Sequence, residues 1–241
     1  AGKLYLILIL LLIASFGFSQ TSQEYYEQAK EIKCNDKDEI KKSIELLDKA
    51  LEINPSYKDA LLLRAQVYDK KEAYKDEIAD ITSLIAIDSA NAGYYKLRAE
   101  AFSKKKDYSK AMDDYAKAFN IDTSKVECVY ERGMIYLEHY LPKEADKALA
   151  DFNFCTVYGS IHIRSMSYLA RGRINESQEK FDMALAEYNT ALKINPLNKD
   201  AFLYRGLLKI GLNQDGCYDL LKYRDMGGAN AQDYLSKYCM K

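Results

Sequence analysis

Residues 168–196, YLARGRINESQEKFDMALAEYNTALKINP, form the clearest structural unit in the sequence. Apolar residues recur there at helical spacing in two runs, which are separated by a turn near residue 180 and stopped by the closing Asn-Pro pair. Small residues at Gly172, Ala184 and Ala191 would let two helices approach closely, and Tyr188 would fill the space between them. The stretch therefore predicts a helical hairpin, and the same pattern returns along the chain.

The composition favours a helical, globular chain. Of its 241 residues, 48% are hydrophobic and 29% are charged, which is enough apolar material for the core of a soluble protein. Three prolines and eleven glycines supply little of the turn punctuation that an all-β protein needs. The formal net charge of -1 at pH 7 lacks the basic excess that attracts nucleic acid or an anionic membrane surface, so we expect no nucleic-acid partner.

Residues 1–19 differ from the rest of the chain. Lys3 precedes an apolar run over residues 4–13, and small residues follow up to Ser19. This order is typical of a secretory signal peptide, and we predict cleavage after Ser19 and a periplasmic or outer-membrane-associated mature chain. The alternative is a membrane anchor, but residues 4–18 are shorter than the ~20 residues that a spanning helix needs. We therefore expect a mature chain that does not span the membrane.

A repeat becomes visible when the chain is aligned on the small residue of the first helix. That residue recurs at intervals of 34, 34, 39 and 34 residues, at Ala65, Ala99, Gly133, Gly172 and Gly206. Second helices carry a large residue followed three positions later by a small one, as in Leu47 and Ala50, Tyr115 and Ala118, Phe152 and Cys155, and Tyr188 and Ala191. Six repeats fit the chain, at residues 22–56, 57–90, 91–124, 125–163, 164–197 and 198–227, with a capping helix at 229–239.

Two repeats depart from the regular spacing. The first has a longer turn at residues 35–38, and the fourth carries extra residues at 139–144 and at 159–162. We expect these insertions to be loops between helices, because loops tolerate changes in length.

The period of 34, the columns of small residues and the Asn-Pro ends resemble the tetratricopeptide repeat family over residues 22–239. The resemblance implies an all-α fold, a right-handed α-solenoid of about six helix-turn-helix repeats closed by a C-terminal capping helix. The chain departs from the family in lacking a Trp in the first helix of each repeat. Its C-terminal residues 216–239 resemble the closing segments of exported bacterial repeat proteins.

Charged residues form two further columns. An arginine stands just before the small residue of the first helix in Arg64, Arg98, Arg132, Arg171 and Arg205. The same repeats carry an acid just before the large residue of the second helix, at Asp80, Asp114, Asp151, Glu187 and Asp219. The first repeat has Gln28 and Leu46 at these places and lacks both charges. We interpret the columns as structural charge pairs within each repeat, rather than as a ladder of cations for an anionic ligand.

Two cysteines near the C-terminus are placed to form a disulfide. Cys217 and Cys239 lie on either side of the Gly227-Gly228 turn, and an antiparallel hairpin folded there brings them opposite one another. Because an exported chain reaches an oxidising compartment, we predict that they are bonded.

The other three cysteines give weaker indications. Cys128 and Cys155 would be neighbours in the hairpin of the fourth repeat, so they are a candidate second disulfide. The alternative is that Cys155 is only a small buried residue, because alanine fills its column elsewhere. No pattern assigns a role to Cys34.

The sequence contains no recognisable catalytic constellation. The two histidines, His139 and His162, fall in the insertions of the fourth repeat and have no metal-ligand partner at helical spacing. The chain also lacks a glycine-rich phosphate loop and a GxSxG nucleophile elbow. We therefore expect no enzymatic activity, no catalytic residue, no metal and no cofactor.

The resemblance implies that first helices line a concave groove for a protein or peptide partner. In that register the groove residues are Leu62, Lys96, Glu100, Tyr130, Met134, Leu137, Leu169, Arg173 and Leu203. Leu207 and Ile210 belong either to the groove or to the packing between neighbouring repeats. The Lys and Asn pattern by which some family members hold a C-terminal carboxylate is not evident.

The function that follows from this groove is protein binding. We expect a non-enzymatic interaction scaffold or adaptor of the cell envelope that binds a partner segment in the groove. The alternative is a structural subunit of an envelope or secretion complex, held through its convex face or its edges.

Overall fold

The computed structural model describes residues 20–239, and every regular element in that range is a helix. The all-α prediction is therefore confirmed. The predicted signal peptide, residues 1–19, lies outside the described residues. From residue 20 to residue 239, no helix is both long enough and apolar enough to cross a membrane.

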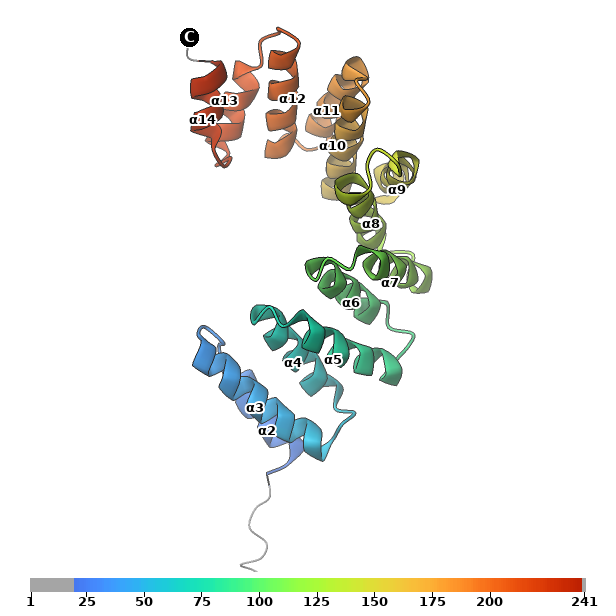
Figure 1. Cartoon of the computed structure of the whole chain (residues 1–241), viewed down its shortest axis with the longest axis vertical. Coiled ribbons are helices and arrows are strands. Elements are labelled where there is room, and N and C mark those ends of the chain that lie inside the picture. Colours follow the sequence, from blue (N-terminus) through green and yellow to red (C-terminus); the bar gives the residue numbers. More distant parts are fainter. Residues whose placement is uncertain (1–19, 240–241) are drawn as a thin grey trace, which may run out of the picture. The chain divides into compact units, whose positions relative to one another are not determined.

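The chain divides into two compact units, Ala1–Asp107 and Tyr108–Lys241, here called the N-terminal unit and the C-terminal unit. Within each unit, Figure 1 shows the helices following one another in chain order. The N-terminal unit contains α2 (Ser22–Lys30), α3 (Lys37–Ile53), α4 (Lys58–Lys70), α5 (Tyr74–Ile87) and α6 (Ala92–Lys104). The C-terminal unit contains α7 (Tyr108–Ile121), α8 (Val126–His139), α9 (Ala145–Tyr158), α10 (Ile161–Ser177), α11 (Phe181–Ile194), α12 (Lys199–Gly211), α13 (Cys217–Asp225) and α14 (Ala231–Tyr238).

Consecutive helices pack as hairpins within each unit. The helix pairs α2 and α3, α4 and α5, α8 and α9, α10 and α11, and α12 and α13 form the predicted repeats, and α14 packs on α13 as the capping helix. The first helices also contact one another, α2 with α4, α8 with α10, and α10 with α12. The third predicted repeat contributes α6 to the N-terminal unit and α7 to the C-terminal unit.

Second helices end where the sequence predicts. The residues that follow them are Asn54-Pro55 after α3, Asp88-Ser89 after α5, Asp122-Thr123 after α7 and Asn195-Pro196 after α11. Asp36 explains the longer turn of the first repeat, because its Oδ1 accepts bonds of 2.9 Å from the backbone N–H groups of Asp38 and Glu39 at the start of α3.

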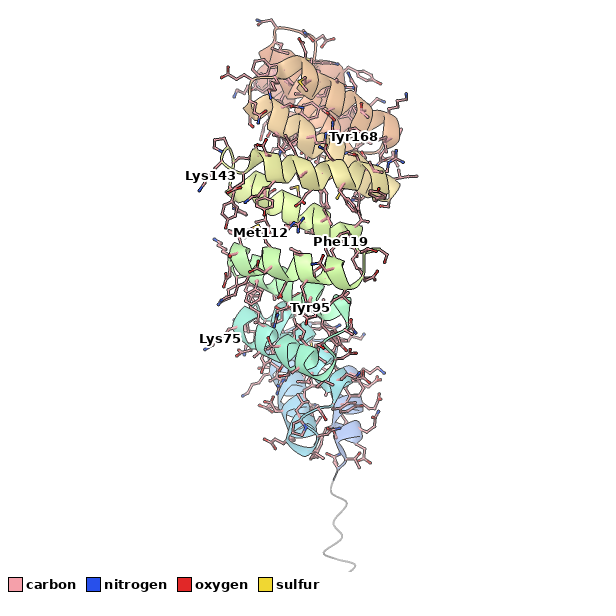
Figure 2. The ribbon with its side chains drawn as sticks, turned by 90° about the vertical axis from the view of Figure 1, so that its right-hand side faces the viewer. Lys75, Tyr95, Met112, Phe119, Lys143 and Tyr168 are labelled. Atoms are coloured by element: carbon pink, nitrogen blue, oxygen red, sulfur yellow. A yellow bond between two sulfur atoms is a disulfide. The ribbon has the colours of Figure 1, made fainter. Side chains whose placement is uncertain are left out.

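The expected loop at residues 159–162 is confirmed only for Gly159 and Ser160, which connect α9 and α10. α10 begins at Ile161, with Ser160 as its N-cap accepting from the N–H of Ile163. Part of this insertion therefore lengthens a helix. The other insertion is a connector between α8 and α9, from which the exposed Lys143 projects (Figure 2).

The columns of small and large residues form the interior of each hairpin. Tyr188 is fully buried and lies so close to Gly172 that a Cβ on this glycine would be 2.3 Å from Cε1 of the tyrosine ring. Gly133 faces Phe152 in the same way, at 2.9 Å. A larger residue at either glycine would push the two helices apart, which is why the column contains only Gly and Ala.

The turns that follow α4, α6, α10 and α12 each contain a residue in the left-handed conformation. Its φ is 59° at Glu72, 65° at Lys106, 59° at Glu179 and 58° at Asn213. At the first of these turns, the N–H of Ala73 donates to the carbonyl of Tyr68 at 2.9 Å, which satisfies the end of α4. None of these positions is a glycine, so the turns carry local backbone strain.

We expect Glu72→Gly to stabilise the N-terminal unit. Glycine adopts a φ of 59° without strain, and the substitution removes a negative charge from the C-terminal end of α4. The free energy of unfolding should rise by about 0.5–1 kcal/mol, after allowance for the greater chain entropy of glycine. Urea denaturation measures this change. Glu72→Ala is the matched control, because it removes the charge but keeps the strain, and an equal gain in both variants would contradict the strain argument.

The C-terminal end is closed by the predicted disulfide. The Sγ atoms of Cys217 and Cys239 are bonded, and the two Cα atoms are 5.7 Å apart. The intervening turn has Gly227 at a φ of 71°, and Gly228 packs on the ring of Tyr223. The hairpin geometry expected from the sequence is thus confirmed.

The candidate second disulfide is wrong. Cys155 is a buried free thiol whose Sγ lies 3.8 Å from the carbonyl of Val126, so it is not bonded to Cys128. Burial raises the pKa of the Cys155 thiol to about 12, which keeps it protonated. Cys155 therefore fills the alanine column as a small apolar residue, as the alternative interpretation expects.

Candidate functional site

The charge pairs between the two helices of a repeat form the first candidate site. Arg64 on α4 donates from Nε to Oδ2 of Asp80 at 2.8 Å and from Nη2 to Oδ1 of the same carboxylate at 2.6 Å. Asp80 on α5 is only 4% exposed. This bidentate bond joins the two helices of the repeat and uses both carboxylate oxygens.

The same pairing occurs in the C-terminal unit. Arg132 and Asp151 form two bonds of 2.9 and 2.6 Å, and Arg205 and Asp219 form two of 2.9 and 2.7 Å. Arg171 donates to Glu187 through a single bond of 2.5 Å. The remaining pair, Arg98 and Asp114, has its members in different units and stays a prediction.

The arginines also reach back to the preceding repeat, which the sequence interpretation missed. Nη1 of Arg64 donates to Asp48 on α3 at 2.6 Å. Nη1 of Arg98 donates to Thr82 on α5 at 3.2 Å, and Nη1 of Arg205 donates to Asn189 on α11 at 2.6 Å. All three acceptors stand 16 residues before their arginine. These three arginines therefore form hydrogen bonds to the preceding repeat in addition to their place in the charge pairs.

These contacts use the donors that an anionic ligand would need. Hydrogen bonds from Arg132 to Asp151 raise the pKa of Arg132, and its charge is compensated inside the protein. For Arg64, burial alone would lower the pKa, but the bonds to Asp80 and Asp48 outweigh burial and raise it. The paired arginines of these repeats are held in ion pairs inside the protein, as the interpretation of structural charge pairs expects.

A cavity of about 300 Å³ lies on the first helices of the C-terminal unit. Three consecutive first helices, α8, α10 and α12, supply all of its walls. The lining residues are Tyr130, Met134, Glu138, Met166, Leu169, Ala170, Arg173, Asp200, Leu203 and Tyr204. We call this cavity the C-terminal groove.

Apolar, aromatic and charged side chains share the lining of the C-terminal groove. The Arg173 guanidinium lies 5.2 Å from the ring centre of Tyr204 and 4.0 Å from the carboxylate of Glu138. Burial raises the pKa of Tyr130, with a further contribution from the charge of Glu131, so its hydroxyl stays neutral. The site therefore offers apolar contact area with ions of both signs beside it.

The structure brings together Tyr130, Met134, Leu169, Arg173 and Leu203, as expected for a groove. The assignment of Leu137 to the groove is wrong, because Leu137 does not line the cavity and packs in the core beside Ile174. Leu207 and Ile210 are half-buried and do not line the groove.

Several residues of the C-terminal groove were not predicted, although helical spacing indicates them. Glu138 continues the series of Tyr130 and Met134 at intervals of four, whereas Leu137 falls one residue short of it. Met166 and Asp200 lie one helical turn before Leu169 and Leu203, and Tyr204 lies four residues after Asp200.

A second cavity, of about 330 Å³, lies in the N-terminal unit between α4, α5 and α6. Its lining includes two predicted groove residues, Leu62 and Glu100. The third predicted residue of this unit, Lys96, lies beside it with Nζ 3.7 Å from the carboxylate of Glu100. We call this cavity the N-terminal pocket.

The two histidines lie at helix ends, and neither belongs to a cluster of possible metal ligands in the described residues. Between residues 20 and 239, no group of three or more His, Cys, Asp or Glu side chains could hold a metal ion. His139 is the last residue of α8 and stacks on Tyr108, with ring centres 3.8 Å apart. His162 is exposed in the first turn of α10. The expectation that both lie in loops is therefore wrong.

Comparisons with known proteins agree with this architecture. The profile of the tetratricopeptide repeat family matches residues 167–196, which are α10, α11 and their turn without the first residues of α10. This match identifies one tetratricopeptide repeat, at residues 167–196. No curated protein matches the sequence significantly.

Solved structures with a similar fold cover most of this chain. A tetratricopeptide repeat protein from Parabacteroides merdae ATCC 43184 is 16% identical, with a TM-score of 0.65 over 91% of this chain and 99% of that one. The MamA protein is 18% identical, with a TM-score of 0.63 over 73% and 92% of the two chains. YrrB, described as a TPR protein with an unusual peptide-binding site, is 20% identical, with a TM-score of 0.60 over 76% and 90%. At these identities the similarity establishes the fold alone.

Proposed function

We propose that this chain is a non-enzymatic protein-binding scaffold or adaptor that receives a partner segment in the C-terminal groove. The observation that carries the proposal is the convergence of three first helices on one partly apolar cavity. A repeat protein that exposes such a surface contacts a partner over several repeats at once. The peptide-binding site of the similar protein YrrB supports this kind of function.

The groove chemistry favours a segment with one large apolar anchor and flanking charges. A volume of about 300 Å³ accommodates a single aromatic or branched side chain against Met134, Met166 and Leu203. Arg173 and Asp200 in the lining would then pair with charges of opposite sign on the segment. An apolar centre with a polar rim is the usual anatomy of an energetically important contact.

We further propose that the mature chain acts in the cell envelope, in the periplasm or at the outer membrane. The support for this location is the predicted signal peptide of residues 1–19. The proposed partner is another protein or peptide of the same compartment. The bonded pair Cys217 and Cys239 is consistent with an oxidising compartment.

A structural subunit held through its edge is the second candidate function. Three large apolar residues at the junction of α9 and α10 are exposed, Val157 by 67%, Tyr158 by 65% and Ile161 by 65%. These three residues lie close together in the sequence, at positions 157, 158 and 161. Single exposed apolar residues scattered over a surface need no explanation, but a group of them does. If the chain is a structural subunit of an assembly, this junction would be buried against a neighbouring protein.

A charge-matched pair of double variants tests the proposed groove. Arg173→Glu/Leu203→Glu places two carboxylates in the C-terminal groove, and we expect the affinity for the partner to fall by about 30-fold, as for loss of a 2 kcal/mol contact. The control Lys193→Glu/Leu197→Glu changes the net charge equally at exposed positions and should bind normally. Partners captured from native envelope by the tagged chain would be quantified by mass spectrometry and their affinities measured by calorimetry.

A third variant separates the two candidate functions. Val157→Glu/Tyr158→Glu alters only the exposed junction of α9 and α10 and should leave capture unchanged under the groove proposal. Loss of partners from this variant, together with full retention by a folded Arg173→Glu/Leu203→Glu chain, would favour the structural subunit instead. Circular dichroism melting curves verify that each variant is folded.

A further inference from the structure

The N-terminal pocket has apolar walls and charged side chains of both signs, because Lys70 and Lys104 line it together with three carboxylates. Leu62, Ile81 and Leu97 provide the walls, from α4, α5 and α6 respectively. Three carboxylates line the same cavity, those of Asp69, Glu77 and Glu100. The pocket therefore combines the two surfaces that a long side chain with a charged end requires.

Glu77 is the unusual member of this set. It is 6% exposed, and its Oε2 is buried with no hydrogen-bond partner. Asp80, one turn further along α5, is equally buried but has both oxygens bonded to Arg64. A buried oxygen without a donor destabilises the folded state, and such a group in a folded protein requires an explanation.

The cations around Glu77 are engaged with other groups. Lys104 on α6 forms an ion pair with Asp69 on α4. Lys70 on α4 donates to the carbonyl of Lys33 at 3.1 Å. Glu100 lies 3.7 Å from Lys96. The Glu77 carboxyl group thus lines a cavity without a committed counter-ion.

We propose that the N-terminal pocket is a subsite for a lysine or arginine side chain of the partner segment, with Glu77 as the acceptor of its cationic group. The aliphatic stem would lie against Leu62, Ile81 and Leu97, and the charged end would reach the unsatisfied carboxylate. A volume of about 330 Å³ is sufficient for one such side chain. This inference rests on the proposed function, because it assigns a chemical preference to the segment that the scaffold binds.

Occupation of the subsite should depend on pH. Burial, and after it the charge of Asp69, raises the pKa of Glu77 to about 7, with Lys104 opposing and Glu100 reinforcing the shift. A raised folded pKa means that Glu77 contributes stability below its unfolded pKa, and this contribution is lost as the pH rises through about 7. A bound cation pairs with the ionised form, so binding should strengthen as Glu77 ionises and then level off.

The test uses the intact chain and two small probes of nearly equal size. N-acetyl-lysine methylamide carries the proposed cation, and N-acetyl-norleucine methylamide carries a similar stem without it. Binding is followed by NMR from the amide signals of α4, α5 and α6, and ionisation from the side-chain carboxyl carbon of Glu77. We expect the lysine probe to bind about tenfold more tightly at pH 8 than at pH 5.5 and to lower the pKa of Glu77, and the norleucine probe to do neither.

A third probe, N-acetyl-arginine methylamide, is measured in the same way to distinguish an arginine from a lysine side chain. Binding by only one of them identifies the side chain that the pocket accepts and supports the proposal. Equal binding of norleucine and lysine would overturn it, as would a Glu77 pKa that does not change when the lysine probe is present.

Glu77→Gln keeps the shape of the side chain and removes its charge. We expect it to weaken lysine-probe binding at least tenfold and to abolish the pH dependence, while Glu45→Gln, at an exposed position on α3, changes neither. If Glu77→Gln fails to fold, the shift of the Glu77 pKa in the native chain still decides the question. Because the probes need no partner, a negative result here leaves the C-terminal groove to be judged by its own variants.

Discussion

Replacing Arg64 by alanine should reduce the free energy of unfolding of the N-terminal unit by about 3–5 kcal/mol. The substitution removes both donors to Asp80, which is 4% exposed, and the bond to Asp48 in the preceding repeat. A buried carboxylate without a partner must either stay charged in a poor environment or take up a proton. Urea denaturation measures the loss, and amide hydrogen exchange locates it in α3, α4 and α5.

The loss should depend on pH in a defined direction. Burial already raises the pKa of Asp80, while the bonds and charge of Arg64 lower it. Without Arg64 the folded pKa rises further above the unfolded value, so the stability that Asp80 contributes is present at low pH and is lost as the pH rises through the folded pKa. Arg64→Ala should therefore be less destabilising at pH 4 than at pH 8.

Two control variants make this prediction specific. Arg64→Met/Asp80→Leu removes both charges and should recover much of the stability, because a well-packed apolar pair replaces the ion pair. Lys75→Ala, at an exposed position on α5, should change the stability by less than about 0.5 kcal/mol. If Arg64→Ala lowers the free energy of unfolding no more than Lys75→Ala does, the arginine column does not stabilise the repeats. A ligand-binding role would then be favoured.

Removing the C-terminal disulfide should free the capping helix. Cys217→Ser/Cys239→Ser opens a loop with a sequence separation of 22, and the expected loss is about 3 kcal/mol in the chain-entropy description. α14 is short, and its buried side chains are Ala231 and Leu235, so packing alone retains it weakly. We expect the amide protection of α14 to fall to that of a fraying terminus, while the protection of α8 and α9 is unchanged.

The control for this variant is another cysteine of the same unit. Cys155→Ala removes a thiol that is not in a disulfide and replaces it with the residue found in its column elsewhere. It should leave the protection of α14 unchanged. Full protection of α14 in the Cys217→Ser/Cys239→Ser chain would mean that helix packing, rather than the disulfide, closes the C-terminal end.

Much of the fold could be predicted because it is repeated. Gly172 and Tyr188 illustrate the reason, since their close contact recurs as Gly133 with Phe152, and a requirement that recurs leaves a column in the sequence. The helix ends at Asn54-Pro55 and Asn195-Pro196 could be predicted from local stereochemistry. By contrast, the left-handed turn residue Glu72 carries no such signal, because glycine is absent there.

The groove was predicted less well than the core. Leu137 was assigned by its apolar character, but the helical period turns it toward Ile174 and turns Glu138 toward the groove. Hydrophobicity alone cannot distinguish a residue that faces the core from one that faces a cavity, because both positions accept leucine. The angle around the helix axis decides between them.

By itself, the sequence determined the helical repeat, the pairing of arginines with acids inside repeats and the partnership of Cys217 with Cys239. These features depend on spacing along the chain, which is written directly in the residue order. Only the tertiary structure decided that Arg64 also binds Asp48, that Cys155 is a thiol and that Glu77 is left without a partner in a cavity. Each of these depends on which side chains from three separate helices meet at one point, and a pattern of neighbours within one repeat does not specify such a meeting.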